Sequence, residues 1–263
     1  MSKQSEYLFT EEVTKIVEQA DLDLDGIRLV HGCHYYVDSR AELKLGIMAK
    51  PMQKSVTARC RAILSASGAP GAKDYDMIDA GIACHANKRI FDELKRSSCG
   101  RKLKFRFSDA YVRCALRSKK ESTDKFAMID VDVIARLRSP CHVLFYTRAT
   151  MAQGSKHPMF ELPWIPTESK PWSAVKRRWL GAAERISTLL DHDYVLEPMV
   201  DSLTDEVFWV KVKIVKKVSG WKPQKLFPRD AEHSVCTVVS GKATTLTRQQ
   251  LRERRDWTRA DRR

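Results

Sequence analysis

The sequence predicts an α+β fold, because segments with a helical period are interspersed with short segments in which apolar and polar residues alternate. Hydrophobic residues make up 43% of the 263 residues, which is enough for a real core, and we expect two small domains. The chain carries 47 lysines and arginines against 33 aspartates and glutamates, a formal net charge of +14. Such an excess opposes compaction unless a polyanion screens it, so the composition points to nucleic acid as the partner.

Other features of the sequence argue against a membrane-spanning role and leave only a peripheral one, which the interspersed carboxylates fit poorly. No apolar run approaches the roughly 20 residues needed to span a bilayer, and Met1–Thr10 lacks the basic-then-apolar pattern of a secretory signal. The seven cysteines are widely spaced and contain no CxxC pair, so we expect reduced, mostly buried thiols. We therefore expect a cytoplasmic protein.

For residues 1–129 the sequence predicts an N-terminal α+β domain. The apolar period of Glu6–Gln19 indicates an amphipathic helix, and Ile27–Val37 is typical of a strand. The remaining predicted elements are a strand at Leu43–Met48, helices at Ser55–Ser65 and Ile78–Leu94, and strands at Lys102–Phe107 and Phe126–Ile129.

Residues 130–220 are predicted to form a second, nucleic-acid-binding domain, followed by a basic C-terminal extension at 221–263. Val131–Met151 indicates two helices that meet at Ser139-Pro140, because proline cannot continue a helix. After the proline-rich connector Pro158–Pro171, Ser173–Leu190 has a continuous apolar stripe that predicts a core-facing helix. A hairpin follows, with strands Tyr194–Val200 and Val207–Val215 joined by the acidic connection Asp201–Glu206.

The helix at Ser173–Leu190 concentrates cations at its N-terminal end, on the side away from its apolar stripe. A helix that enters the major groove contacts bases with side chains of its N-terminal part, and lysine or arginine also grips the flanking phosphates. The alternative is an ordinary solvated basic face. The candidate nucleic-acid-binding residues here are Lys170, Trp172, Ser173, Lys176, Arg177 and Arg178.

Two further segments supply candidate phosphate contacts. In the strand Val207–Val215, Lys211 and Lys213 alternate with apolar residues, so one face should be buried and the other basic, or merely solubilising. Near the C-terminus four arginines share one helical face, which can follow a phosphate backbone and order on binding, unless the segment is only a basic tail. These arginines are Arg248, Arg252, Arg255 and Arg259.

The central and C-terminal segments resemble plasmid replication initiators of the TrfA and Rep type. The resemblance lies in Leu137–Phe145, a leucine–serine–proline lead into a helix, in the basic, alanine-rich Lys176–Glu184, and in Leu189–Val212. It implies two winged-helix domains that bind repeated origin DNA, with oligomeric state controlling initiation. It also implies that Ile78–Leu94 and Lys102–Ile129 supply the first winged helix.

Several patterns suggest catalytic or metal sites, but none is complete. Asp21–Gly26 copies the opening of a calcium loop without its closing glutamate, and His31-Gly-Cys-His34 lacks the paired ligand spacing of structural zinc. Asp130 and Asp132 have the residue types of a nuclease site but fit a helix cap, and Asp38 with Glu42 and Lys44 is the other such group. We expect no catalytic residues, no metal and no cofactor.

The sequence thus favours a non-enzymatic, sequence-specific DNA-binding protein, a replication initiator of plasmid or phage type. Its partners would be nucleic acid, DNA ahead of RNA, in a homo-oligomer or larger nucleoprotein assembly. Two alternatives remain: an RNA-binding subunit of a ribonucleoprotein complex such as a CRISPR-type effector, and a metal-dependent nuclease.

Overall fold

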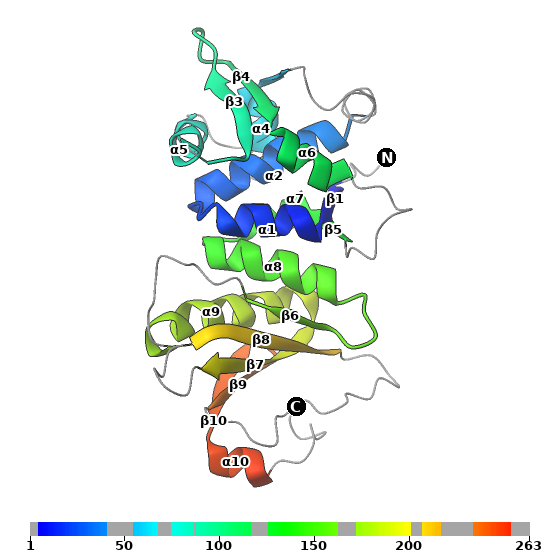
Figure 1. Cartoon of the computed structure of the whole chain (residues 1–263), viewed down its shortest axis with the longest axis vertical. Helices are drawn as coiled ribbons and strands as arrows, with labels where there is room; N and C mark the ends of the chain where they lie inside the picture. Colours follow the sequence, from blue (N-terminus) through cyan, green and yellow to red (C-terminus); the bar gives the residue numbers. More distant parts are fainter. Residues whose placement is uncertain are drawn as a thin grey trace. The chain divides into compact units, whose positions relative to one another are not determined.

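The computed structural model describes residues 5–40, 55–67, 75–86, 88–116, 126–162, 172–200, 207–216 and 234–253. The chain divides into two compact units, Met1–Val143 and Leu144–Arg263. Both units combine helices and strands (Figure 1), so the predicted α+β class is confirmed. None of the helices within the described residues is long and apolar enough to cross a membrane.

The first unit contains two small antiparallel sheets. Strands β1 and β5 form a pair, and β2, β4 and β3 form a three-stranded sheet with β4 in the middle. Its elements are β1 (Glu6–Thr10), α1 (Glu11–Gln19), α2 (Leu24–Asp38), β2 (Val56–Arg59), α4 (Cys60–Ser67), α5 (Asp76–Cys84), β3 (Phe91–Arg96), β4 (Lys102–Phe107), α6 (Asp109–Leu116), β5 (Phe126–Asp130) and α7 (Val131–Arg136).

Helix α2 is the centre of the first unit, because it is buried on almost every side. Close approach of its neighbours depends on small residues. A Cβ at Gly32 would lie 2.1 Å from Ser67 Oγ of α4, and a Cβ at Gly81 of α5 would lie 2.9 Å from Leu29. The sequence therefore packs α4 and α5 against α2 at positions where only glycine fits.

The second unit is built on one five-stranded antiparallel sheet in the order β10-β9-β7-β8-β6. Its elements are α8 (Pro140–Ala152), which begins just before the unit boundary, β6 (Met159–Glu161), α9 (Trp172–Leu190), β7 (His192–Val200), β8 (Val207–Lys216), β9 (Val235–Val239), β10 (Lys242–Leu246) and α10 (Arg248–Glu253).

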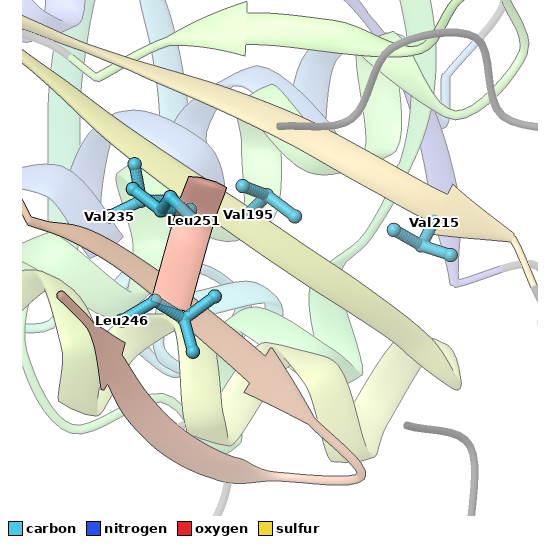
Figure 2. Packing of buried hydrophobic residues seen from close by; sticks show 5 residues of the cluster. All are labelled: Val195, Val215, Val235, Leu246 and Leu251. Carbon is cyan, nitrogen blue, oxygen red and sulfur yellow. The ribbon is translucent and has the colours of Figure 1, made fainter. Parts of the chain in front are cut away.

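Helices cover both faces of this sheet. On one face Phe145 of α8 packs edge-on against Tyr194 of β7, with ring centroids 5.0 Å apart, and α9 lies along β7 and β9. On the other face Leu251 of α10 closes a small apolar cluster (Figure 2). The other buried members of that cluster are Val195, Val215, Val235 and Leu246.

The two units share one topology. In each, a helix is followed by a strand, then by helical structure, then by two strands, and the first strand pairs with the last. The sheet order β2-β4-β3 in the first unit therefore corresponds to β6-β8-β7 in the second. In the second unit β9 and β10 extend the sheet beyond β7.

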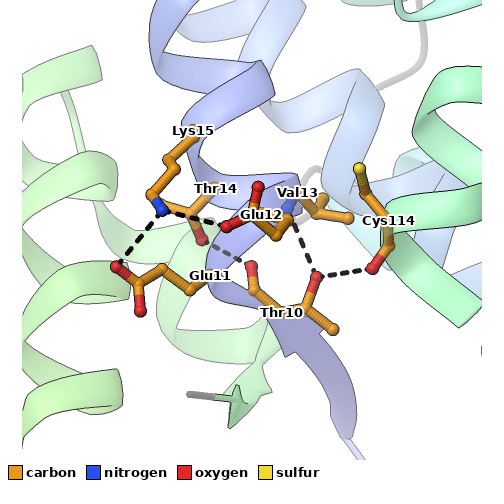
Figure 3. A network of polar contacts seen from close by, with 7 residues as sticks. All are labelled: Thr10, Glu11, Glu12, Val13, Thr14, Lys15 and Cys114. Carbon is orange, nitrogen blue, oxygen red and sulfur yellow. Dashed lines mark hydrogen bonds and ion pairs between the residues drawn. The ribbon is translucent and has the colours of Figure 1, made fainter. Parts of the chain in front are cut away.

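Two predictions at the N-terminus are wrong. The helix predicted over Glu6–Gln19 begins only at Glu11, because Thr10 ends strand β1 and caps α1. Thr10 Oγ1 accepts from the amide of Val13 at 3.3 Å and donates to the carbonyl of Cys114 at 3.0 Å (Figure 3). This cap holds the β1–α1 junction against α6.

The predicted strand Ile27–Val37 is instead the middle of helix α2. A helix buried all round shows no amphipathic period, so its apolar run looks like a strand. Asp23, part of the calcium-like loop, is the N-cap of this helix and accepts from the amide of Gly26 at 2.7 Å. The predicted partner strand Leu43–Met48 lies outside the described residues.

Two predicted helices are correct only in part. Ser55–Ser65 is strand β2 followed by α4, and Ile78–Leu94 spans the end of α5 and the start of β3. Short strands next to helices give too few residues for their period to be read. Confirmed predictions are β4, β5, the helix pair α7 and α8, helix α9, and the hairpin of β7 and β8.

The sequence placed a domain boundary at 129/130, whereas the chain divides between Val143 and Leu144. It also treated 221–263 as an extension, yet β9 and β10 belong to the sheet of the second unit. The signal for this hairpin is present in Ser240-Gly241. Both residues have positive φ, 48° and 78°, which suits the tight turn between two antiparallel strands.

Candidate nucleic-acid interface

The outward side of α9 carries three of the candidate residues, Ser173, Arg177 and Arg178. Trp179, Ala182, Ala183 and Ile186 are buried, in agreement with the predicted apolar stripe. The opposite side forms what we call the α9 arc. Its exposed members are Ser173, Arg177, Arg178, Arg185 and Thr188.

Gly181 lies within this arc, one turn after Arg177 and one turn before Arg185. A Cβ at Gly181 would meet nothing within 4 Å, so packing does not require a glycine there. Glycine inside a helix costs roughly 0.5–1 kcal/mol relative to alanine. A glycine flanked by arginines on an open helix face is suited to the close approach of another backbone.

Lys176 does not belong to the arc. Its ammonium group donates to Thr245 Oγ1 of β10 at 2.8 Å, and the side chain is half-buried. From the same side of α9, Glu184 Oε1 accepts from the amide of Ala243 at 2.9 Å and Ser187 Oγ from that of Gly241 at 3.0 Å. These contacts fix α9 to the β9–β10 hairpin and thereby determine which side of the helix faces outward.

The strand lysines face carboxylates. Lys213 Nζ lies 3.0 Å from Glu197 Oε2, and the two side chains are only 14% and 15% exposed. Lys211 lies in register between Glu161 of β6 and Glu197 of β7. Lys213 is therefore neutralised by the chain itself, and we do not include this face in the interface.

The C-terminal arginines are described only in part. Helix α10 begins with a reciprocal cap: the amide of Gln250 donates to Thr247 Oγ1 and the amide of Thr247 donates to Gln250 Oε1. The backbones of Arg248 and Arg252 lie in this helix. Lys170, Arg255 and Arg259 lie outside the described residues, so their predicted contacts stay predictions.

Trp172 opens α9 and is half-buried. Among the described residues its indole N–H has no hydrogen-bond partner. This N–H is itself buried, so it is not available as a donor to a ligand at the surface.

The residues considered for metal or catalysis have structural roles. Asp130 Oδ1 caps α7 by accepting from the amide of Asp132 at 2.8 Å, as predicted. His31 hydrogen-bonds to Tyr7, and complete burial lowers the pKa of His31 to about 3. His34 contacts the hydroxyl of Tyr111 at 2.8 Å. No group of three or more His, Cys, Asp or Glu in the described part of the chain could hold a metal ion.

The seven cysteines are all free thiols, and four of them are buried. A scan against protein-family models, a search of curated proteins and a search of solved structures each found no match to this chain, so its function is inferred from its own residues.

Proposed function

We propose that this chain is a non-enzymatic, sequence-specific DNA-binding protein that uses α9 as its major-groove helix. The α9 arc supports the proposal most directly, because it places three exposed arginines along one side of the helix. Arginine binds guanine edges and phosphates with two parallel hydrogen bonds, which is the commonest specific contact to duplex DNA.

The topology supports the same proposal. Each unit follows the order helix, strand, helical segment and two strands, with sheet order first-third-second, and a winged helix has the same order of elements. In such an arrangement the helix before the last two strands enters the groove, and in the second unit that helix is α9. Together with the resemblance to plasmid initiators, this favours a cytoplasmic protein that binds origin DNA as a homo-oligomer.

The test is binding to fluorescein-labelled 20-bp duplexes selected from a random library, measured by anisotropy. Arg177→Ala with Arg185→Ala should weaken binding to the selected duplex at least about tenfold, because each lost arginine contact to a base edge is worth about 1–3 kcal/mol. The control is Arg113→Ala with Arg136→Ala, which removes two exposed arginines from α6 and α7.

The control should bind like the wild type. Equal affinities of the α9 variant and the control would refute the role of the arc. Failure of the library to yield a preferred duplex, with tighter binding to single-stranded or duplex RNA, would favour a ribonucleoprotein subunit over a DNA-binding protein.

A further inference from the structure

The outer face of the three-stranded sheet in the first unit is strongly basic. Along β4, Leu103, Phe105 and Phe107 are buried, and the residues between them point to the other side. The register places Arg59 of β2 and Lys95 of β3 on that same outer side. We call this the basic sheet face, and its cations are Arg59, Lys95, Lys102, Lys104 and Arg106.

Carboxylates neutralise only part of this positive charge. Glu93 contacts Lys95 at 2.9 Å and Lys104 at 3.0 Å, and Asp92 lies 3.7 Å from Arg106. A hydrogen bond from Ser55 and the two lysines lowers the pKa of Glu93 to about 2, so it stays ionised at neutral pH.

The charges of Arg59 and Lys102 are not neutralised in this way. They lie directly opposite one another in the β2–β4 register and are both exposed. Neither forms an ion pair with a carboxylate of the described residues. Like charges directly opposite one another destabilise a sheet. A pair that costs stability and that no carboxylate neutralises indicates an anionic partner.

Within the described residues of the first unit, the helix that corresponds to α9 in chain order is not basic. That position is held by α5, whose first turn carries Asp76 and Asp79, and Asp79 pairs with Arg96 at 3.0 Å. A phosphate backbone would be repelled by the start of α5. If the first unit contacts nucleic acid, the sheet is therefore the surface with the right charge.

We propose that the basic sheet face, centred on Arg59 and Lys102, is a second, sequence-independent binding surface for the phosphate backbone of the same duplex DNA. Its outward positions hold lysine, arginine, threonine, glutamate and aspartate but no aromatic residue, so it offers phosphate contacts and no stacking platform for unpaired bases. The identity of the ligand, duplex DNA, rests on the proposed function. The geometry of the basic sheet face does not depend on α9.

The test compares three variants that each remove two cations: Arg59→Thr with Lys102→Thr in the sheet, Arg177→Ala with Arg185→Ala in α9, and the control Arg113→Ala with Arg136→Ala. Binding to the selected duplex and to an unrelated 20-bp duplex is measured by anisotropy between 50 and 300 mM salt. The sheet variant should bind both duplexes more weakly by the same factor, roughly tenfold. The slope of log affinity against log salt concentration should fall in magnitude by about 2. Threonine suits a strand, so the sheet should persist.

Thermal unfolding provides an internal check. Because the sheet variant loses a like-charge pair, its melting temperature should equal or exceed that of the wild type, and weaker binding by a more stable protein cannot be a folding defect. The proposal is overturned if the sheet variant binds like the control. If the sheet variant keeps its DNA affinity and the α9 variant loses affinity, the basic sheet face does not bind DNA and the proposed function stands. If the sheet variant loses affinity and the α9 variant keeps it, the basic sheet face binds DNA and α9 does not.

Discussion

At the scale of single residues, the two glycines Gly32 and Gly181 illustrate opposite uses of a missing side chain. Gly32 lies where helix α2 touches α4, and a Cβ there would overlap Ser67. Gly181 lies on an open helix face where a Cβ would meet nothing. One glycine allows two helices to approach, whereas the other weakens its helix without any gain in packing.

Gly32→Ala should therefore destabilise the protein by about 1–3 kcal/mol, because α2 and α4 must separate. Gly181→Ala should stabilise it by about 0.5–1 kcal/mol. Urea unfolding measures both, and Gly32→Ala combined with Ser67→Ala should recover part of the loss. Equal effects of the two single substitutions would show that the packing at Gly32 is not as described.

At the scale of elements, the contacts of Glu93 in the basic sheet face predict how the stability of the fold changes at acidic pH. The pKa of Glu93 in the folded chain is about 2, below the ordinary value of 4.5, so its contribution to stability is present above pH 4.5 and is lost as the pH falls toward 2. An NMR titration of the Glu93 carboxyl carbon should give a midpoint near 2. Ser55→Ala, which removes the main cause, should raise that midpoint. A midpoint near 4.5 in the wild type would contradict the described contacts.

Elements with an exposed and a buried side were predicted well from sequence, because their period is visible. This holds for α9, for β4 and for the β7–β8 hairpin. Helix α2 was missed because burial on all sides removes the period, and β9–β10 was missed although Ser240-Gly241 marks its turn.

The positions of the candidate residues were predicted only in part. The orientation of α9 places Arg177 outward, as its position on the helical wheel indicates, but Lys176 turns to Thr245 of a hairpin that the sequence reading did not contain. The basic sheet face was missed as a site. Its signal, cations at every second residue of Lys102–Phe107, is readable only when Arg59 is known to lie in the neighbouring strand.

At the scale of the whole molecule, part of the net charge of +14 is exposed on the α9 arc and on the basic sheet face, whereas Lys213 is neutralised internally. Residues 254–263 add five arginines against two aspartates. They follow helix α10, whose Leu251 is part of the core.

Deletion of residues 254–263 should therefore leave the fold intact and weaken binding to every duplex alike, with a flatter salt dependence, because only phosphate contacts are lost. Anisotropy at several salt concentrations measures this. Deletion from Thr247 onward should in addition lower the melting temperature, because it removes Leu251. A change in sequence preference after the shorter deletion would contradict this division.

The shared topology places lysines at corresponding positions of the two sheets. Strand β4 of the first unit carries Lys102 and Lys104, and strand β8 of the second carries Lys211 and Lys213 at the same spacing. Lys211 lies in register with Glu161 of β6 and Glu197 of β7, whereas Lys102 lies opposite Arg59 and Lys104 contacts Glu93. The residues opposite the lysines thus set the net charge of such a sheet face, and a substitution there changes that charge while the lysines and the topology stay the same.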